Sequence, residues 1–482
     1  MTALAPEGLA AAIDLGVCAR CCLRIAGVTD IALYVLPEDE LNASIQDIAD
    51  RETPRDASSA GVATSPVVCS CCVGVLSGAL HDEIVADIRH QSLASNYDAT
   101  DYALKIKLPS AVLLREYSLL QHLRRSVSSF PSRVPFDLKE TLKALVSAAI
   151  STCLNDAVCS NASNFAVTLD FKHDESADEV QQLPAIKFQL ENTRKRRRGP
   201  EPVLGGFGAV TRALEQLSVM PETVKSPPSL LSSRPTVVVT LERDPVYLQG
   251  RYLKFKRGLS QSPWVLEGVR MGESSVEEAI GDIALPYFRG ASYKFHTAGR
   301  EDVDVRMLGN GRPFILEVID AKKANLTAAE YKEVEDVVNA ANVGIVEIRH
   351  TKASTKEYFA GLQAGADSKK KTYCCVVWSE AELTPEAVAK LDAIQDLTIQ
   401  QETPVRVLHR RTLMTRPKVI HSAKCEVLNK HYMLLRLTTS AGTYVKEFVH
   451  GDRGRTLPNV SSILGCDADI LQLDVENLLD AA

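Results

Sequence analysis

The chain has 482 residues, 45% of them apolar and 24% charged, a composition typical of soluble globular proteins with room for two or three domains. No stretch approaches the ~18 consecutive apolar residues of a membrane span, and the N-terminus carries an early acid without a basic start, so we expect neither a membrane anchor nor a secretory signal. The net charge of −6 gives no overall sign of nucleic-acid binding, although local basic clusters can still bind a phosphate backbone.

Six of the 12 cysteines lie in the first hundred residues. They form two C-x-x-C pairs, Cys18 with Cys21 and Cys69 with Cys72. Four thiolates complete a tetrahedral zinc site without an open position, so this pattern predicts a structural zinc. The neighbouring thiols of Cys22 and Cys71 leave the choice of ligands open, and unrelated buried cysteines are the alternative. We therefore interpret residues 1–100 as a zinc-binding segment in which residues 30–65 loop out.

Residues 101–218 show the mixed pattern of an α+β unit. Strands are predicted near 102–108, 165–171 and 185–190, with helices reaching His122 and spanning 137–154. The basic run Arg194–Arg198 lies in a predicted loop, where an RNA contact, a nuclear import signal and a solvated loop all remain open. Residues 219–235 are rich in proline and serine and are interpreted as a linker.

Residues 236–482 have the size of one further domain. Ser275 with Glu278 and Thr327 with Glu330 indicate capping boxes, and Thr384-Pro385 indicates a third helix start. Gln249-Gly250 suggests a tight turn within a strand region at 246–255. Further strands are predicted at 314–319, 343–349, 372–378, 405–408, 417–421 and 432–438. The alternation of strands and helices fits a mixed α/β or an α+β domain, and we expect α+β with a mixed or antiparallel central sheet.

The segment from Arg300 to Arg306 concentrates two arginines and three acids. If it is extended, Arg300, Asp302, Asp304 and Arg306 share one face. A carboxylate between guanidinium groups stays ionised and can act as a base or nucleophile. A solvated charge ladder on an edge strand is the alternative. Gly309-Asn310-Gly311 is a weak sign of nucleotide binding, because the remaining phosphate-loop residues are missing.

Several long motifs resemble the pseudouridine synthase 10 family of archaea and eukaryotes. They are the paired C-x-x-C head, Arg257–Trp264, Gly299–Pro313, Thr403–Arg411 and Ala441–Asp452. The resemblance implies a pseudouridine synthase catalytic domain at 236–482 and a THUMP-like RNA-binding domain at 101–218. It also implies conversion of uridine to pseudouridine in the T-arm loop of tRNA, at position 54, 55 or both. This isomerisation needs no organic cofactor, so structural zinc is the cofactor expected.

The resemblance also implies roles for individual residues. Asp302 is the catalytic carboxylate, with Asp304 as the alternative; Tyr373 stacks on the flipped base, and Lys446 pairs with the aspartate. Without the resemblance, Tyr373 reads as a core side chain and Lys446 as a surface lysine. The basic residues expected to bind RNA are Arg300, Arg306, Arg410, Arg411, Lys369, Lys370 and Lys371.

A base held inside a folded tRNA must leave its stack before chemistry, and an aromatic platform then supports it. We expect a monomer that acts on tRNA in the nucleus, the cytoplasm or both, without a membrane partner. A non-catalytic RNA-binding protein or RNA chaperone on the same scaffold is the alternative function. Asp302, Tyr373 and Lys446 together favour the enzyme, because a pure binder has no need of a carboxylate that faces RNA phosphate.

Overall fold

The computed structural model describes residues 6–50, 68–128, 130, 133–188, 205–217, 219, 221–364, 370–409 and 411–479. The chain divides into two compact units, Met1–Arg243 and Asp244–Ala482. The sequence placed this boundary at 235/236. It falls later because β4 (Thr236–Arg243) pairs along its whole length with β3 (Phe165–Lys172) and so completes the sheet of the first unit.

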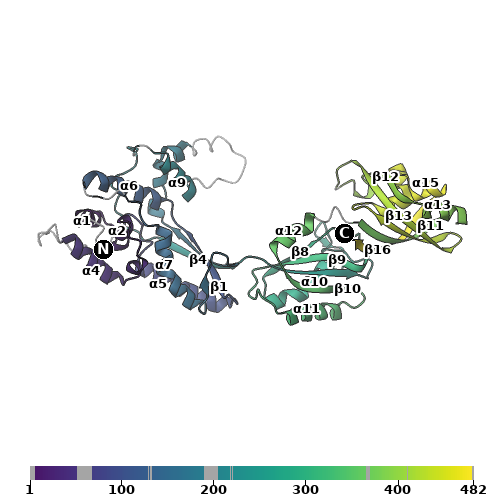
Figure 1. Ribbon diagram of the computed structural model, residues 1–482, viewed down its shortest axis with the longest axis horizontal. Helices are drawn as coiled ribbons and strands as arrows, with labels where there is room; N and C mark the ends of the chain where they lie inside the picture. Colours follow the sequence, from purple (N-terminus) through teal and green to yellow (C-terminus); the bar gives the residue numbers. More distant parts are fainter. Residues whose placement is uncertain are drawn as a thin grey trace. The chain divides into compact units, whose positions relative to one another are not determined.

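The first unit has one main hydrophobic core, shared by the segments 1–100 and 101–218 that the sequence treated separately. Leu9, Ile84 and Val167 all belong to it. The remaining elements of this unit are α1 (Pro6–Asp14), α2 (Ala19–Ile25), α3 (Ile31–Tyr34), α4 (Glu38–Asp50), α5 (Gly78–Ser95), β1 (Asp101–Lys107), α6 (Ala111–Ser126), α7 (Leu138–Cys153), β2 (Val158–Cys159), η1 (Asp174–Ser176), η2 (Glu179–Gln182) and α9 (Phe207–Glu215). Figure 1 shows them in purple to teal.

Strands β2, β1, β3 and β4 form the sheet of this unit in that order, with β1 parallel to both of its neighbours. Two local predictions differ from the structure. The segment expected to loop out contains α3 and α4, because Leu41 and Ile45 of α4 are buried in the core. Residues 184–188 are helical where a strand was expected.

The expected linker at 219–235 packs on the first unit instead. Leu231 is buried and forms a β-bridge with Val68. The buried guanidinium of Arg115 donates a 3.0 Å hydrogen bond to the carbonyl of Ser229. Pro and Ser content therefore marked irregular backbone correctly but did not reveal that side chains of the unit hold it.

The second unit is built on a ten-stranded sheet with the order β10-β5-β9-β16-β11-β14-β13-β12-β15, in which β8 also pairs with β9. Neighbours are antiparallel except β9 and β16, which pair in parallel over two residues. The strands are β5 (Val246–Lys254), β8 (Ser292–Thr297), β9 (Arg306–Ile319), β10 (Val346–Ser354), β11 (Lys370–Ser379), β12 (Gln395–Glu402), β13 (Thr415–Asn429), β14 (Tyr432–Thr439), β15 (Thr456–Leu457) and β16 (Ala468–Leu479). A separate hairpin joins β6 (Val265–Leu266) to β7 (Val269–Arg270).

The predicted helix starts are confirmed in this unit. The Ser275 side chain caps α10 (Val276–Phe288), and Thr327 with Glu330 forms a complete capping box at α11 (Ala328–Ala341). Thr384 caps α13 (Pro385–Asp392). The other helices are α12 (Lys356–Ala364), α14 (Val445–His450) and α15 (Val460–Leu464), with 3-10 turns η4 (Val405–Val407) and η5 (Gly451–Gly454). Helices α10 and α11 pack on each other and against β10 (Figure 1).

The turn predicted at Gln249-Gly250 is wrong, because close packing inside a strand requires this glycine, and close packing also requires Gly309. Gly250 lies inside the continuous strand β5, where a Cβ would come within 2.8 Å of the Phe314 ring. A Cβ on Gly309 would lie 1.9 Å from the carbonyl oxygen of Glu476 in β16. Residues 405–407 form η4 and Leu408 follows it as a turn, instead of the strand expected at 405–408, and the neighbouring strand is β12.

The predicted α+β architecture with a mixed sheet is confirmed. Among the helices of the described residues, none combines the length and the hydrophobicity that crossing a bilayer requires.

Candidate active site

Residues 299–305, here called the Asp302 loop, are irregular and lead directly into β9. The shared face of Arg300, Asp302, Asp304 and Arg306 was conditional on an extended segment, and that condition is not met at 299–305. The backbone carbonyls of the loop are satisfied by side chains and by the N–H groups of Val305 and Gly258, not by a neighbouring strand. Lys254 binds the carbonyls of Asp302 and Val303 at 3.1 and 3.3 Å, and Arg257 binds that of Asp304 at 2.9 Å.

Two acids of this loop meet two cations that come from far along the chain. Arg406 Nη1 lies 2.9 Å from Asp302 Oδ2, and Lys446 Nζ lies 3.5 Å from the same oxygen. Lys446 is closer to Asp304, with its Nζ at 2.9 and 2.7 Å from the two carboxylate oxygens. The expected pairing of Lys446 with an aspartate is therefore present, but Lys446 is shared and Arg406 makes the closer contact with Asp302.

Arg406 and Lys446 are held in place by different contacts. Arg406 also donates through Nε to the buried Glu447 at 2.7 Å, so one guanidinium joins Asp302 to α14. Its guanidinium lies 5.8 Å from the ring centre of Tyr444. The buried side chain of Gln401 fixes the residue before α14, since it accepts from the Tyr444 N–H at 2.9 Å and donates to the Tyr444 carbonyl at 2.9 Å. Lys446 thus projects from a fixed helix start.

The charges around Asp304 keep it ionised. Partial burial alone would raise its pKa, but the hydrogen bonds and positive charge of Lys446 outweigh burial, so the pKa of Asp304 lies below its ordinary value. Asp302 has 36% of its side chain exposed and contacts both cations. The arrangement holds a solvent-accessible carboxylate next to two positive charges, as a base or nucleophile requires.

Tyr373 lies on β11 and is buried. Burial raises the pKa of Tyr373 to about 12. The positive charge of Arg312 opposes this shift, and the negative charge of Asp302 adds to it. The phenol therefore stays neutral at physiological pH and lies within electrostatic range of Asp302 and Arg312.

The basic residues expected to bind RNA separate into different groups. Arg300, Lys370 and Arg411 are exposed, and Lys371 is half-buried. Lys369, Arg410 and the run Arg194–Arg198 lie outside the described residues.

Arg306 has a partner inside the protein. Its Nε donates to Asp474 Oδ1 at 3.0 Å and its Nη2 to the second oxygen of the same carboxylate, which joins β9 to β16. Arg257 also reaches Asp474, at 2.6 Å. This bidentate geometry favours a structural role for Arg306 over an RNA contact.

Sequence reasoning missed Arg406 and Lys254 as site residues. Arg406 lies within the Thr403–Arg411 motif, and Lys254 closely precedes Arg257–Trp264, so both motifs marked the correct region. Their partners are distant in sequence, and no periodic pattern relates Arg406 to Asp302.

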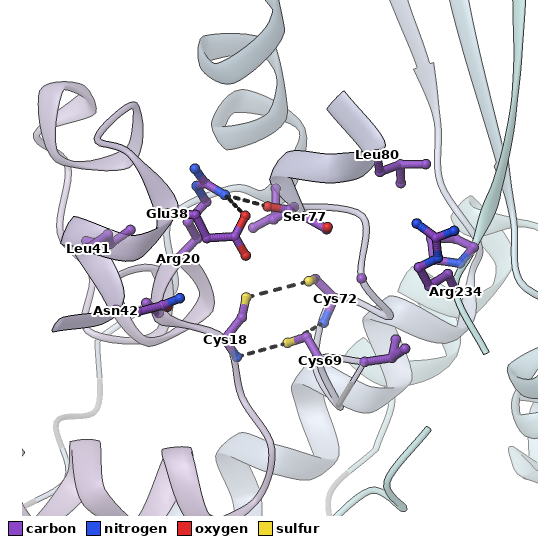
Figure 2. Close-up of a pocket in the computed structure, with 15 residues that line it drawn as sticks. Cys18, Arg20, Glu38, Leu41, Asn42, Cys69, Cys72, Ser77, Leu80 and Arg234 are labelled. Atoms are coloured by element: carbon purple, nitrogen blue, oxygen red, sulfur yellow. Dashed lines mark hydrogen bonds and ion pairs between the residues drawn. The ribbon is translucent and has the colours of Figure 1, made fainter. Parts of the chain in front are cut away.

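The second candidate site is the cysteine cluster, formed by Cys18, Cys21, Cys69 and Cys72. Their sulfurs all lie within 4.8 Å of one another, so the cluster could hold a metal ion, as predicted. Cys18 Sγ and Cys72 Sγ are 3.9 Å apart. A tetrahedral ion with metal–sulfur bonds of about 2.3 Å would separate its sulfurs by about 3.8 Å, so the spacing fits. Figure 2 shows three of these cysteines facing one another.

Backbone groups support the cluster. The N–H of Cys18 donates to Cys69 Sγ at 3.3 Å, and the N–H of Cys72 reaches the same sulfur at 3.5 Å. Arg24 Nη1 lies 3.8 Å from Cys21 Sγ. These donors stabilise negative charge on sulfur, the form that binds metal. Cys22 is buried beside the cluster, and its Sγ donates to the carbonyl of Val17 at 3.9 Å.

A cavity of about 150 Å³ adjoins the cluster, lined by Cys18, Cys69 and Cys72 together with Arg20, Glu38 and Arg234. Arg20 donates to the Leu76 carbonyl at 2.8 Å and lies 3.4 Å from Glu38 (Figure 2). These contacts connect α2 and α4 to the turn that carries Cys69 and Cys72.

The fold and the two sites define a two-unit α/β protein, with a cation-held carboxylate in one unit and a possible metal site in the other. The chain matches the family model "Pus10, C-terminal" over residues 247–479 and "Eukaryotic Pus10, N-terminal" over residues 69–242. It belongs to the Pus10 family.

Relatives of this family span both eukaryotes and archaea. The tRNA pseudouridine synthase Pus10 of Xenopus laevis is 35% identical, covering 97% of this chain and 95% of its own length. That of Thermofilum pendens is 36% identical over 51% of this chain and 55% of its own length. A solved structure titled "Crystal structure of pseudouridylate synthase" is 16% identical and covers 62% of this chain and 89% of that chain. Its TM-score of 0.20 is too low to carry an argument.

Proposed function

We propose that the protein is a tRNA pseudouridine synthase, an isomerase that converts uridine to pseudouridine. The observation that carries the proposal is the Asp302 carboxylate beside Arg406 and Lys446 in a chain of the Pus10 family. The chemistry breaks the C–N glycosidic bond, turns the uracil and forms a C–C bond to the same ribose. No atom is gained or lost, so the residues of the chain suffice as catalysts.

Each site residue has a defined part in this proposal. Asp302 is the carboxylate that meets the nucleotide, and its contacts with Arg406 and Lys446 orient it. Tyr373 supplies an aromatic wall for the base that leaves its stack. Arg300, exposed beside Asp302, is placed to bind phosphate.

The target within tRNA is the T-arm loop, at position 54, 55 or both. The family resemblance supports this choice. We also propose that residues 101–218 act as a THUMP-like RNA-binding domain and that the first unit holds the tRNA body. Arg194–Arg198 and Lys369–Lys371 add electrostatic affinity, and the protein works as a monomer in the nucleus, the cytoplasm or both.

Zinc is the metal proposed for the cysteine cluster. Four thiolates without an open ligand position are typical of a structural zinc site, and the 3.9 Å sulfur separation supports this. Zinc would then join α2 to the turn at 69–72 and leave the reaction to the second unit.

The test incubates purified protein with an unmodified tRNA transcript and maps pseudouridine by mass spectrometry of nuclease fragments. Pseudouridine in the T-arm loop is expected, and its absence from a transcript whose T-arm uridines are replaced by cytidine is the control. Tight binding without conversion would overturn the proposal in favour of the non-catalytic RNA-binding alternative.

A further inference from the structure

A lysine with no exposed surface lies beneath the Asp302 loop. Lys254 is the last residue of β5, and its side chain is 0% exposed. Its Nζ donates to three backbone carbonyls, those of Leu259 at 2.8 Å, Asp302 at 3.1 Å and Val303 at 3.3 Å. An ammonium group has three N–H donors, so each donor has a carbonyl.

A buried carboxylate balances this charge. Glu301, which precedes Asp302, has a side chain only 1% exposed, and its Oε1 lies 3.9 Å from Lys254 Nζ. Arg312 Nε donates to Glu301 Oε2 at 2.9 Å. The Tyr252 hydroxyl lies 2.9 Å from both carboxylate oxygens. Burial lowers the pKa of Lys254, and the charge of Glu301 opposes that shift.

The same group of residues also grips the loop before Asp302. Gln261 Nε2 donates to the Tyr252 hydroxyl at 2.8 Å and to the Gly299 carbonyl at 3.2 Å. Arg312 Nη1 donates to the Ala298 carbonyl at 2.8 Å. The backbone on both sides of Asp302 is therefore tied to one buried polar network.

Stability alone is a poor account of this network. Well-packed apolar side chains often stabilise a core as well as a buried ion pair, because removing charges from water is costly. What apolar groups cannot do is fix carbonyl oxygens in defined positions. Here one of those carbonyls belongs to Asp302 itself, whose side chain has to be placed between Arg406 and the nucleotide.

We propose that Lys254 is a positioning residue for the reaction: it holds the backbone of Asp302 so that the carboxylate meets the nucleotide in a productive geometry. The network around Lys254 holds its ammonium group and the loop backbone in fixed positions through Glu301, Tyr252, Arg312 and Gln261. This inference rests on the proposed function and adds a source of catalytic precision outside the carboxylate and its two cations.

The test compares wild type with Lys254→Met in a single-turnover assay at saturating tRNA, together with the dissociation constant for the same tRNA. Met keeps the length and volume of the side chain but has no N–H donor. A misplaced catalytic group costs about 100-fold in rate, so we expect a fall of about that size with an unchanged dissociation constant. Lys352→Met, which changes an exposed lysine of β10, is the matched control and should retain the wild-type rate.

Melting curves and near-UV circular dichroism establish that each variant is folded at the assay temperature. A folded Lys254→Met with the wild-type rate would overturn the inference, as would equal losses of rate and affinity, which indicate general damage. If Lys254→Met does not fold, Tyr252→Phe decides, since it removes one hydroxyl from the network. The loss of one hydrogen bond that aligns the loop should slow the reaction about tenfold and leave the affinity for tRNA unchanged, which supports the positioning role. A Tyr252→Phe variant with the wild-type rate overturns that role. A wild-type protein that forms no pseudouridine would instead refute the proposed function.

Discussion

The Asp302 loop and the cysteine cluster both hold irregular backbone, but they do so with different forces. In the loop, carbonyls of residues 302–304 receive hydrogen bonds from Lys254 and Arg257. In the cluster, four sulfurs from two segments about fifty residues apart converge within 4.8 Å. The first arrangement leaves the Asp302 carboxylate accessible and oriented, whereas the second buries nearly all of its ligand groups.

This difference predicts that the two regions fail differently. Damage to the loop should remove chemistry while the fold persists, because its polar network lies within one well-packed sheet domain. Damage to the cluster should loosen the first unit while the chemistry of the second unit persists.

The largest effect is expected from Asp302→Asn. Amide for carboxylate preserves shape but removes the charge, so turnover should fall by about 1,000-fold or more, the scale of an essential catalytic carboxylate, while tRNA binding is kept. The measurement pairs single-turnover kinetics with a tRNA titration. Asp304→Asn is the matched control, and a loss of activity in that variant with retained activity in Asp302→Asn would move the catalytic role to Asp304.

Removal of the metal comes next. Wild type should contain about one equivalent of zinc, and Cys69→Ser should contain almost none, because a closed site needs all four thiolates. The first unit of Cys69→Ser should melt at a lower temperature than that of wild type, whereas the single-turnover rate at saturating tRNA should stay near that of wild type. Cys22→Ser, a change at a buried thiol outside the cluster, should keep its zinc. Zinc retained in Cys69→Ser would contradict the four-cysteine assignment.

Glu301→Gln should act on stability within the loop network. Removing one partner of a buried ion pair leaves Arg312 and Lys254 uncompensated, which costs about 3–5 kcal/mol in the free energy of unfolding. Urea unfolding followed by tryptophan fluorescence measures this cost. Glu333→Gln, on the exposed side of α11, is a suitable control. If Glu301→Gln loses no more free energy of unfolding than Glu333→Gln does, the buried carboxylate does not stabilise the network.

The sequence was most informative where local chemistry decides structure. Capping residues located the starts of α10, α11 and α13, and cysteine spacing located the cluster, because both depend on residues a few positions apart. The segment 300–305 is irregular, so the alternating faces of an extended strand do not form there. The carbonyls of this segment bind Lys254 and Arg257, which lie some fifty residues earlier in the sequence. The alternating charges within the segment could not predict those partners.

The pairing of Arg406 with Asp302 shows the same limit. The two residues are 104 positions apart, and they meet because η4 and the Asp302 loop lie in one sheet domain. Family motifs placed both in the correct regions. Only the fold shows that Arg406, and not Lys446, makes the closer contact with Asp302.

The smallest effect concerns Asp304, whose folded-state pKa lies below its ordinary value. A lowered carboxyl pKa contributes stability above the unfolded pKa of about 3.9, and the contribution is lost as pH falls through the folded pKa. Lys446→Met should move the pKa of Asp304 upward, since its closest cation is removed. Carbon-13 titration of the Asp304 carboxyl group measures the change. An unchanged pKa would mean that Arg406 and the backbone, not Lys446, set the charge of Asp304.

The position of β16 has a consequence for how the protein is made. This strand is the last of the sheet in sequence, yet it lies between β9 and β11, and its Asp474 receives Arg257 and Arg306. The strand that joins β9 to β11 is therefore synthesised after Asp302, Tyr373, Arg406 and Lys446. During synthesis the two halves of the sheet wait for β16, so a growing chain should not modify the tRNAs that surround it until that strand emerges.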